Sequence, residues 1–107
     1  MKALVNNQTL FIYPETDLVA SRIESLRDFI LGQLRQYKEP SRIVLDASGI
    51  EIVDSLGVNL IIGLYRQADS ESKKFEIVAA GNQFMKVANF FRFSTLFSVK
   101  SKEEKGD

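Results

Sequence analysis

The sequence predicts a single α/β domain with a mixed, mostly parallel sheet of four to five strands and three to four helices packed on it. Short apolar runs alternate with longer segments whose apolar residues recur every three or four positions, a pattern typical of alternating strands and helices. The length of 107 residues suits one domain. Strands joined through helices pair in parallel by right-handed crossovers, so we expect the helices to pack on a central sheet.

The sequence predicts strands over residues 3–5, 10–13, 43–45, 75–80 and 96–99, and helices over residues 18–37, 56–68 and 84–91. The first two strands come before the first helix, and strands and helices alternate from there on. The turn-forming run Asn6-Asn7-Gln8 separates the first two strands, which therefore form a hairpin, and Pro14 ends it. The third strand is an uninterrupted apolar run that ends at Asp46, as in a strand buried on both faces.

Each predicted helix has apolar residues at spacings of three and four along one face. The first helix ends before Pro40, because the residue before a proline avoids helical geometry. Residues 1–99 make up the predicted domain, and a charged tail, residues 100–107, follows it.

Five phenylalanines lie near the C-terminus: Phe84, Phe90, Phe91, Phe93 and Phe97. Most of them are expected in the core, since the third helix and the last strand must cover the sheet. Phe90 and Met85 lie off the apolar face of the third helix, which includes Phe91, so these two are candidates for contact with a partner.

The composition excludes several kinds of chemistry. The chain has no His and no Cys, which excludes Ser-His-Asp and Cys-His catalysis and histidine- or cysteine-ligated metals, so we expect no enzyme activity and no cofactor. A site for Mg²⁺ or Ca²⁺ made only of carboxylates stays open. Fourteen basic and fourteen acidic residues give no indication of nucleic-acid binding. Without a signal-peptide pattern or a membrane-length apolar run, we expect a cytoplasmic protein that does not insert into membranes.

The loop between the third strand and the second helix is the first place to look for a site, since ligands collect at the carboxyl ends of strands in open α/β sheets. Asp54 and Ser55 are adjacent helix-capping residues, and Gly57 follows them. The simplest interpretation is that one of the two caps the helix.

A second interpretation starts from apolar residues that the predicted core face does not use. The predicted core face of the second helix is formed by Leu60, Ile61 and Leu64. Val58 and Ile62 lie off that face, so they form an exposed patch for another protein unless the sheet folds further over the helix. We place Leu56 and Asn59 in the same predicted interface. Phosphorylation of Ser55 would put about −1.5 to −2 charges at the edge of this patch.

Residues 43–66, IVLDASGIEIVDSLGVNLIIGLYR, resemble the signature of STAS domains, specifically of bacterial anti-sigma factor antagonists. That signature is an apolar strand ending in Asp, a loop, and Asp-Ser-Ser/Thr-Gly-Leu/Ile-Gly at the start of a helix. Residues 13–17 resemble the Gly-Glu-Leu-Asp turn after the family's second strand, and the likeness extends over residues 4–99. Leu56 stands in place of the second Ser/Thr, and Asn59 in place of the second Gly.

The resemblance implies a regulatory domain that is switched by phosphorylation of Ser55. The kinase would be an anti-sigma factor that uses ATP and Mg²⁺. The unphosphorylated domain would bind this kinase and release its sigma factor or other client, and a PP2C-type phosphatase would restore the serine. By the same resemblance, the phosphosite is flanked by Asp17, Asp54 and Gly57, and Asp46 lies at the end of the strand below it. The alternative is that the three aspartates only cap helices or form turns.

Three other functions suit parts of the same sequence. The same fold could be a STAS subunit that binds a transporter ATPase or a larger signalling assembly, or that holds a small apolar ligand. A receiver-like domain with Asp46 as phosphate acceptor is disfavoured, since no acidic pair follows the first strand to bind Mg²⁺. A carboxylate-based enzyme at Asp46, Glu51 and Asp54 is disfavoured because a domain of this size offers no deep pocket.

Overall fold

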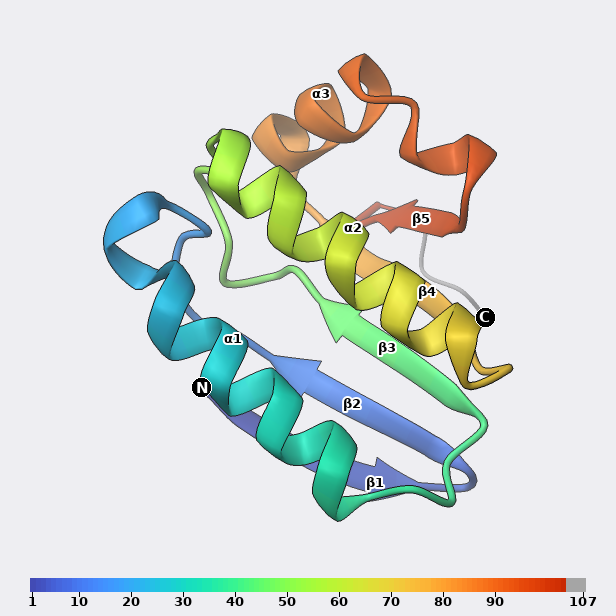
Figure 1. The fold of residues 1–107 in the computed structure, drawn as a ribbon. Coiled ribbons are helices and arrows are strands. Elements are labelled where there is room, and N and C mark those ends of the chain that lie inside the picture. Colours follow the sequence, from blue (N-terminus) through green and yellow to red (C-terminus); the bar gives the residue numbers. More distant parts are fainter. Residues whose placement is uncertain (104–107) are drawn as a thin grey trace.

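The strands and helices follow one another in the predicted order (Figure 1). The structure, a computed structural model, describes residues 1–103. Its elements are β1 (Lys2–Asn6), β2 (Thr9–Tyr13), α1 (Ala20–Gln36), β3 (Arg42–Asp46), α2 (Ser55–Ser70), β4 (Lys74–Ala80), α3 (Asn82–Phe90), the 3₁₀ turn η1 (Phe93–Thr95) and β5 (Ser98–Ser101).

The five strands form one mixed sheet whose order, β1-β2-β3-β4-β5, is the order of the chain. β1 pairs with β2 antiparallel, and every later pair is parallel, which confirms the predicted fold class. Asn7 and Gln8 join β1 to β2 with φ angles of 50° and 64°, the left-handed geometry of a two-residue hairpin turn. Because each parallel crossover steps in one direction along the sheet, α1 and α2 lie side by side on the same face (Figure 1).

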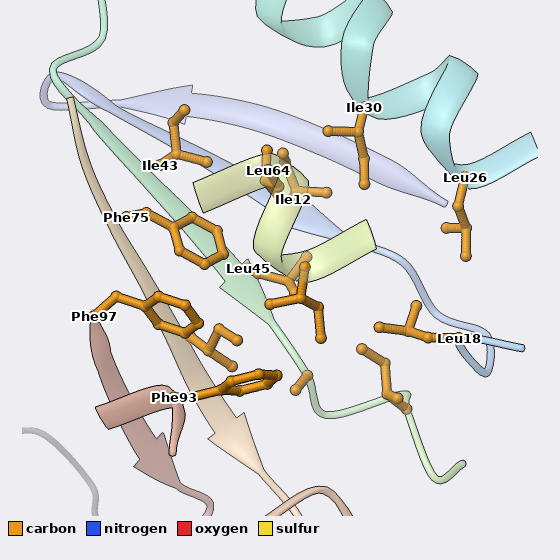
Figure 2. Packing of buried hydrophobic residues seen from close by; sticks show 14 of the residues in the cluster. Ile12, Leu18, Leu26, Ile30, Ile43, Leu45, Leu64, Phe75, Phe93 and Phe97 are labelled. Atoms are coloured by element: carbon orange, nitrogen blue, oxygen red, sulfur yellow. The ribbon is translucent and has the colours of Figure 1, made fainter. Parts of the chain in front are cut away.

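The core lies between that face of the sheet and the helices (Figure 2). Alternate residues of the three central strands point into it, as the two-residue period of a strand requires: Leu10, Ile12, Ile43, Leu45, Phe75 and Ile77. The buried face of α1 is Ile23, Leu26, Ile30 and Leu34. Phe93 and Phe97 extend the core toward β4 and β5, where Phe97 meets Phe75 edge-on at 4.8 Å between ring centroids.

The buried face of α2 differs from the predicted one. It comprises Gly57, Val58, Ile61, Leu64 and Ala68, whereas Leu60 and Ile62 are half-buried on either side. Val58 is only 7% exposed, so the prediction that it lies in an exposed patch was wrong. The first turns of α2 are apolar nearly all round, and such a sequence fits more than one rotation of the helix about its axis.

Most of the C-terminal phenylalanines are buried, as predicted, but Phe91 is not. The helix α3 ends at Phe90, and Arg92 turns the chain with a left-handed φ of 56°, so Phe91 no longer follows the helical face and is exposed. The last strand begins two residues later than predicted and includes the first two residues of the predicted tail, 100–107. Residues 104–107 of that tail lie outside the described residues.

Candidate functional site

Two loops lie side by side at the carboxyl ends of β2 and β3, residues 14–19 and 47–54, and we call them together the loop junction. The Leu18 amide donates to the Ile52 carbonyl at 2.9 Å, and the Asp54 amide donates to the Leu18 carbonyl at 3.1 Å. Leu18 and Val53 thus form a parallel bridge, with Leu18 buried in the core. The junction brings the N-termini of α1 and α2 together.

The carboxylate of Asp17 fastens the junction from one side. Its Oδ1 accepts hydrogen bonds from the amides of Glu51 at 2.9 Å and Ile52 at 3.1 Å. Asp17 is therefore a turn residue of the loop junction, holding backbone that is distant in sequence.

The carboxylate of Asp54 caps two helices at once. Its Oδ1 accepts from the Gly57 amide at 2.9 Å, the ordinary cap of α2, and its Oδ2 accepts from the Ala20 amide at 2.8 Å, at the start of α1. Val19 precedes α1 and supplies no side-chain cap, so Asp54 fills that role from the other loop. The amides of Gly57 and then Ala20 lower the pKa of the Asp54 carboxyl below its ordinary 3.8, because they stabilise the ionised form.

Gly57 allows the helix to approach this closely. A Cβ at this position would lie 2.2 Å from the Leu18 carbonyl oxygen and 2.9 Å from Cγ1 of Val53. Any side chain would force α2 away from the loop junction, so the glycine of the Asp-Ser-Leu-Gly sequence has a steric function.

Ser55 is the first residue of α2 and is exposed. Within residues 1–103 its hydroxyl forms no hydrogen bond, so it is available to an external group. It follows an ionised carboxylate and lies at the positive end of the helix dipole. A hydroxyl in this position can take up a phosphoryl group without disturbing any bond in the fold.

Asp46 does not join this cluster of bonds. Its Oδ1 accepts from the amide of Ser48 at 2.9 Å and from the Ser48 hydroxyl at 2.6 Å, which forms a local turn after β3. The structure thus brings Asp17 and Asp54 to the loop junction beside Ser55, and gives Asp46 a turn of its own.

Exposed apolar residues precede and follow Ser55 in the sequence. Ile52 is 59% exposed and Leu56 is 46% exposed, while Asn59 is exposed one turn further along α2. Sequence reasoning missed Ile52, although four apolar residues in the eight-residue loop 47–54 are more than a solvated loop needs. Beside it is a hollow of about 370 Å³ lined by Glu51, Ile52, Val53, Gln83 and Val87, between the loop junction and α3.

Among residues 1–103, no three acidic side chains gather closely enough to hold a metal ion. No helix in this part of the chain has the length and apolar character to cross a bilayer.

The domain resembles solved structures that share little of its sequence. A candidate anti-sigma factor antagonist of Thermotoga maritima, TM1081, superposes with a TM-score of 0.84 at 14% identity, over 94% of this chain and 85% of that chain. The anti-sigma factor antagonist SpoIIAA of Bacillus superposes in its unphosphorylated form with a TM-score of 0.68 at 20% identity, over 97% and 91% of the two chains. Its phosphorylated form gives 0.69 at 20% identity, over 96% and 93%. These likenesses show a shared fold.

Membership of a family rests on the sequence itself. No curated protein matches the chain in a sequence search. The family model described as "Mlab, STAS domain" matches residues 13–98, from the end of β2 to the start of β5, and so includes both loops of the junction and all three helices. The chain therefore belongs to the STAS domain family.

Proposed function

We propose that this STAS domain is an anti-sigma factor antagonist whose partner binding is switched off by phosphorylation of Ser55. The observation that carries the proposal is the exposed Ser55 hydroxyl at the first residue of α2, unbonded within residues 1–103, with the exposed apolar residues Ile52 and Leu56 close to it in the sequence. Two structures of similar fold are those of SpoIIAA in its unphosphorylated and phosphorylated forms, which supports a switch of this kind.

The phosphoryl transfer needs no base from this chain. The Ser55 oxygen attacks the γ-phosphorus of ATP, the bond to the ADP oxygen breaks, ADP leaves, and a base of the kinase takes the hydroxyl proton. In the reverse direction a PP2C-type phosphatase directs water onto the phosphorus, which breaks the Ser55 O–P bond and releases inorganic phosphate. Both partners would work on the domain in the cytoplasm, where ATP is available.

The phosphate would act on the partner more than on the fold. The Gly57 amide already donates a hydrogen bond to Asp54, whose lowered pKa favours the ionised carboxylate. A phosphate on Ser55 would therefore add a charge of about −1.5 to −2 beside an existing negative charge. A partner that covers Ile52 and Leu56 would have to bury this charge or leave it unpaired, which is costly at an interface. Binding should therefore be lost while the domain stays folded.

Phosphorylation is tested with the full chain as bait in lysate of the organism that makes it. Wild type should capture a kinase that labels it from ATP, and the label should map to Ser55 and vanish in Ser55→Ala. Ser48→Ala is the matched control, because Ser48 is an exposed serine nearby whose hydroxyl is bonded to Asp46. Label that persists in Ser55→Ala would refute the assignment, and a captured transporter ATPase without a kinase would favour the transporter-subunit alternative.

The binding surface is tested separately. Leu56→Lys should weaken capture of the kinase by about tenfold or more, as expected for loss of a central apolar contact. Leu4→Lys is the matched control, since Leu4 on β1 is 46% exposed like Leu56 but lies on the far edge of the sheet. Equal binding by both variants would place the interface elsewhere.

A further inference from the structure

A surface groove runs between α1 and α2, and it shares only Leu56 and Asn59 with the predicted partner interface. It encloses about 380 Å³, within the range of pockets that hold small organic molecules. Ile30, Leu34 and Leu64 form its buried floor, Leu60 forms a half-buried wall, and Leu56 lies exposed at one end. We call it the α1–α2 groove.

One cation stands at the edge of this apolar groove. Arg27 is the one charged side chain among the described residues that line it; Asn59 and Gln67 are the polar ones. Arg27 is exposed and forms no ion pair within residues 1–103. A guanidinium with free donors beside an apolar trough fits a ligand with an anionic head and an apolar body, because it can hold a carboxylate through two hydrogen bonds.

The groove stays open because position 63 has no side chain. Gly63 lies in the middle of α2 and lines the groove, and a Cβ there would meet no atom of residues 1–103 within 4 Å. No close approach of backbone requires this glycine, unlike Gly57. A longer side chain at position 63 would fill space that a ligand needs.

We propose that the α1–α2 groove binds a single-chain anionic amphiphile, such as a medium-chain carboxylate, with the alkyl chain over the leucine-rich floor and the carboxylate on Arg27. The charge complementarity of Arg27 and the apolar lining select this ligand class. The proposal is independent of phosphorylation, since Ser55 is not among the residues that line the groove; of the predicted partner interface, Leu56 and Asn59 line it.

The test is titration of the full chain with decanoate below its micelle concentration, followed by amide chemical shifts. Shifts should concentrate on α1 and α2 along the groove. Decanol should bind more weakly and decyltrimethylammonium more weakly still. Arg27→Gln should reduce decanoate affinity by about two- to fivefold, as expected for an exposed ion pair, and leave decanol unchanged.

Gly63→Met should reduce the affinity for both decanoate and decanol by about tenfold or more, because its side chain occupies the groove. Gly32→Met is the matched control: Gly32 is a mid-helix glycine of α1 with equally open surroundings, and it does not line the groove. Both variants should fold, since each replaces a helical glycine with a better helix former.

Three results would overturn the proposal. The first is no saturable shift with decanoate in the wild type. The second is shifts that centre elsewhere, for example on the exposed Phe90 and Phe91. The third is equal binding by Gly63→Met and Gly32→Met. The wild-type shift map decides the matter even if a variant is unstable, and none of these results bears on labelling of Ser55.

Discussion

Replacing Gly57 with alanine should destabilise the domain, whereas the same replacement at Gly63 in the same helix should stabilise it. The added methyl at position 57 would lie 2.2 Å from the carbonyl oxygen of Leu18 and 2.8 Å from its Cβ. Non-bonded carbon atoms rest at about 3.5–4.0 Å, so α2 and the loop junction would have to part by about 1 Å. At position 63 the methyl would meet none of the described atoms within 4 Å.

The cost follows from what holds the two parts together. The Leu18–Ile52 and Asp54–Leu18 backbone hydrogen bonds, at 2.9 and 3.1 Å, would lengthen. Each such bond contributes about 1 kcal/mol net, and overpacking adds about 1–3 kcal/mol. Against this, alanine gains up to about 1 kcal/mol over glycine in a helix. The free energy of unfolding should therefore fall by about 2–4 kcal/mol in Gly57→Ala and rise by about 0.5–1 kcal/mol in Gly63→Ala.

Urea unfolding followed by circular dichroism measures both changes. Thermal melts should agree, with a Tm lower by about 10–20 °C for Gly57→Ala and higher by a few degrees for Gly63→Ala. If Gly57→Ala were as stable as wild type, the close approach of α2 to Leu18 would not exist in solution. If both variants lost stability equally, helix context and not this contact would explain the effect.

Three further perturbations test other parts of the structure. The pKa of Asp54 is lowered in the folded state, so its carboxylate stabilises the fold above pH 3.8, and this stabilisation is lost as the pH falls through the lower folded pKa. In thermal melts across a pH series, the Tm advantage of wild type over Asp54→Asn should therefore shrink below about pH 4. A Tm difference that stays constant with pH would contradict the double cap. Phe93→Ala should cost about 3–5 kcal/mol in urea unfolding, while Phe90→Ala, at a side chain 79% exposed, should stay within about 0.5 kcal/mol; similar losses would refute the burial pattern. Asp17→Ala should speed hydrogen exchange at the amides of Glu51 and Ile52, which donate hydrogen bonds to the Asp17 carboxylate. Unchanged protection of these two amides would show that the loop junction does not depend on Asp17.

The sequence predicted the order of the elements because each has a clear local pattern. The hairpin was recognisable from turn residues between apolar runs, and α1 from one apolar face with Ile23, Leu26, Ile30 and Leu34 at helical spacing. The rotation of α2 was not recognisable, since Leu60 and Ile62 are as apolar as the buried Val58. The rotation of α2 about its axis depends on the close packing of Gly57 on Leu18, and these two residues are far apart in the sequence.

The candidate site divides in the same way. A helix cap by either Asp54 or Ser55 is a local feature that the sequence predicts, and the structure shows that Asp54 is the cap, through the Gly57 amide. The second bond of Asp54 reaches Ala20, which is 34 residues earlier, and no local rule predicts it. The exposure of Ile52 likewise depends on how the two loops cross. The family resemblance pointed to the start of α2, while the hydrogen bonds that build this helix end came from the structure.

The chain-order arrangement of the strands bears on how the domain forms during synthesis. Each new strand after β1 pairs with the strand that was made just before it, so no strand has to wait for a partner that has not yet left the ribosome. Parallel sheets fold slowly when they pair strands far apart in sequence, because the connecting loops must close first. Here growth can proceed from the β1–β2 hairpin toward β5 in one direction, and the edge that is exposed at any moment is covered by the next unit to emerge. Pulse-labelling hydrogen exchange should find the hairpin and β3 protected before β5.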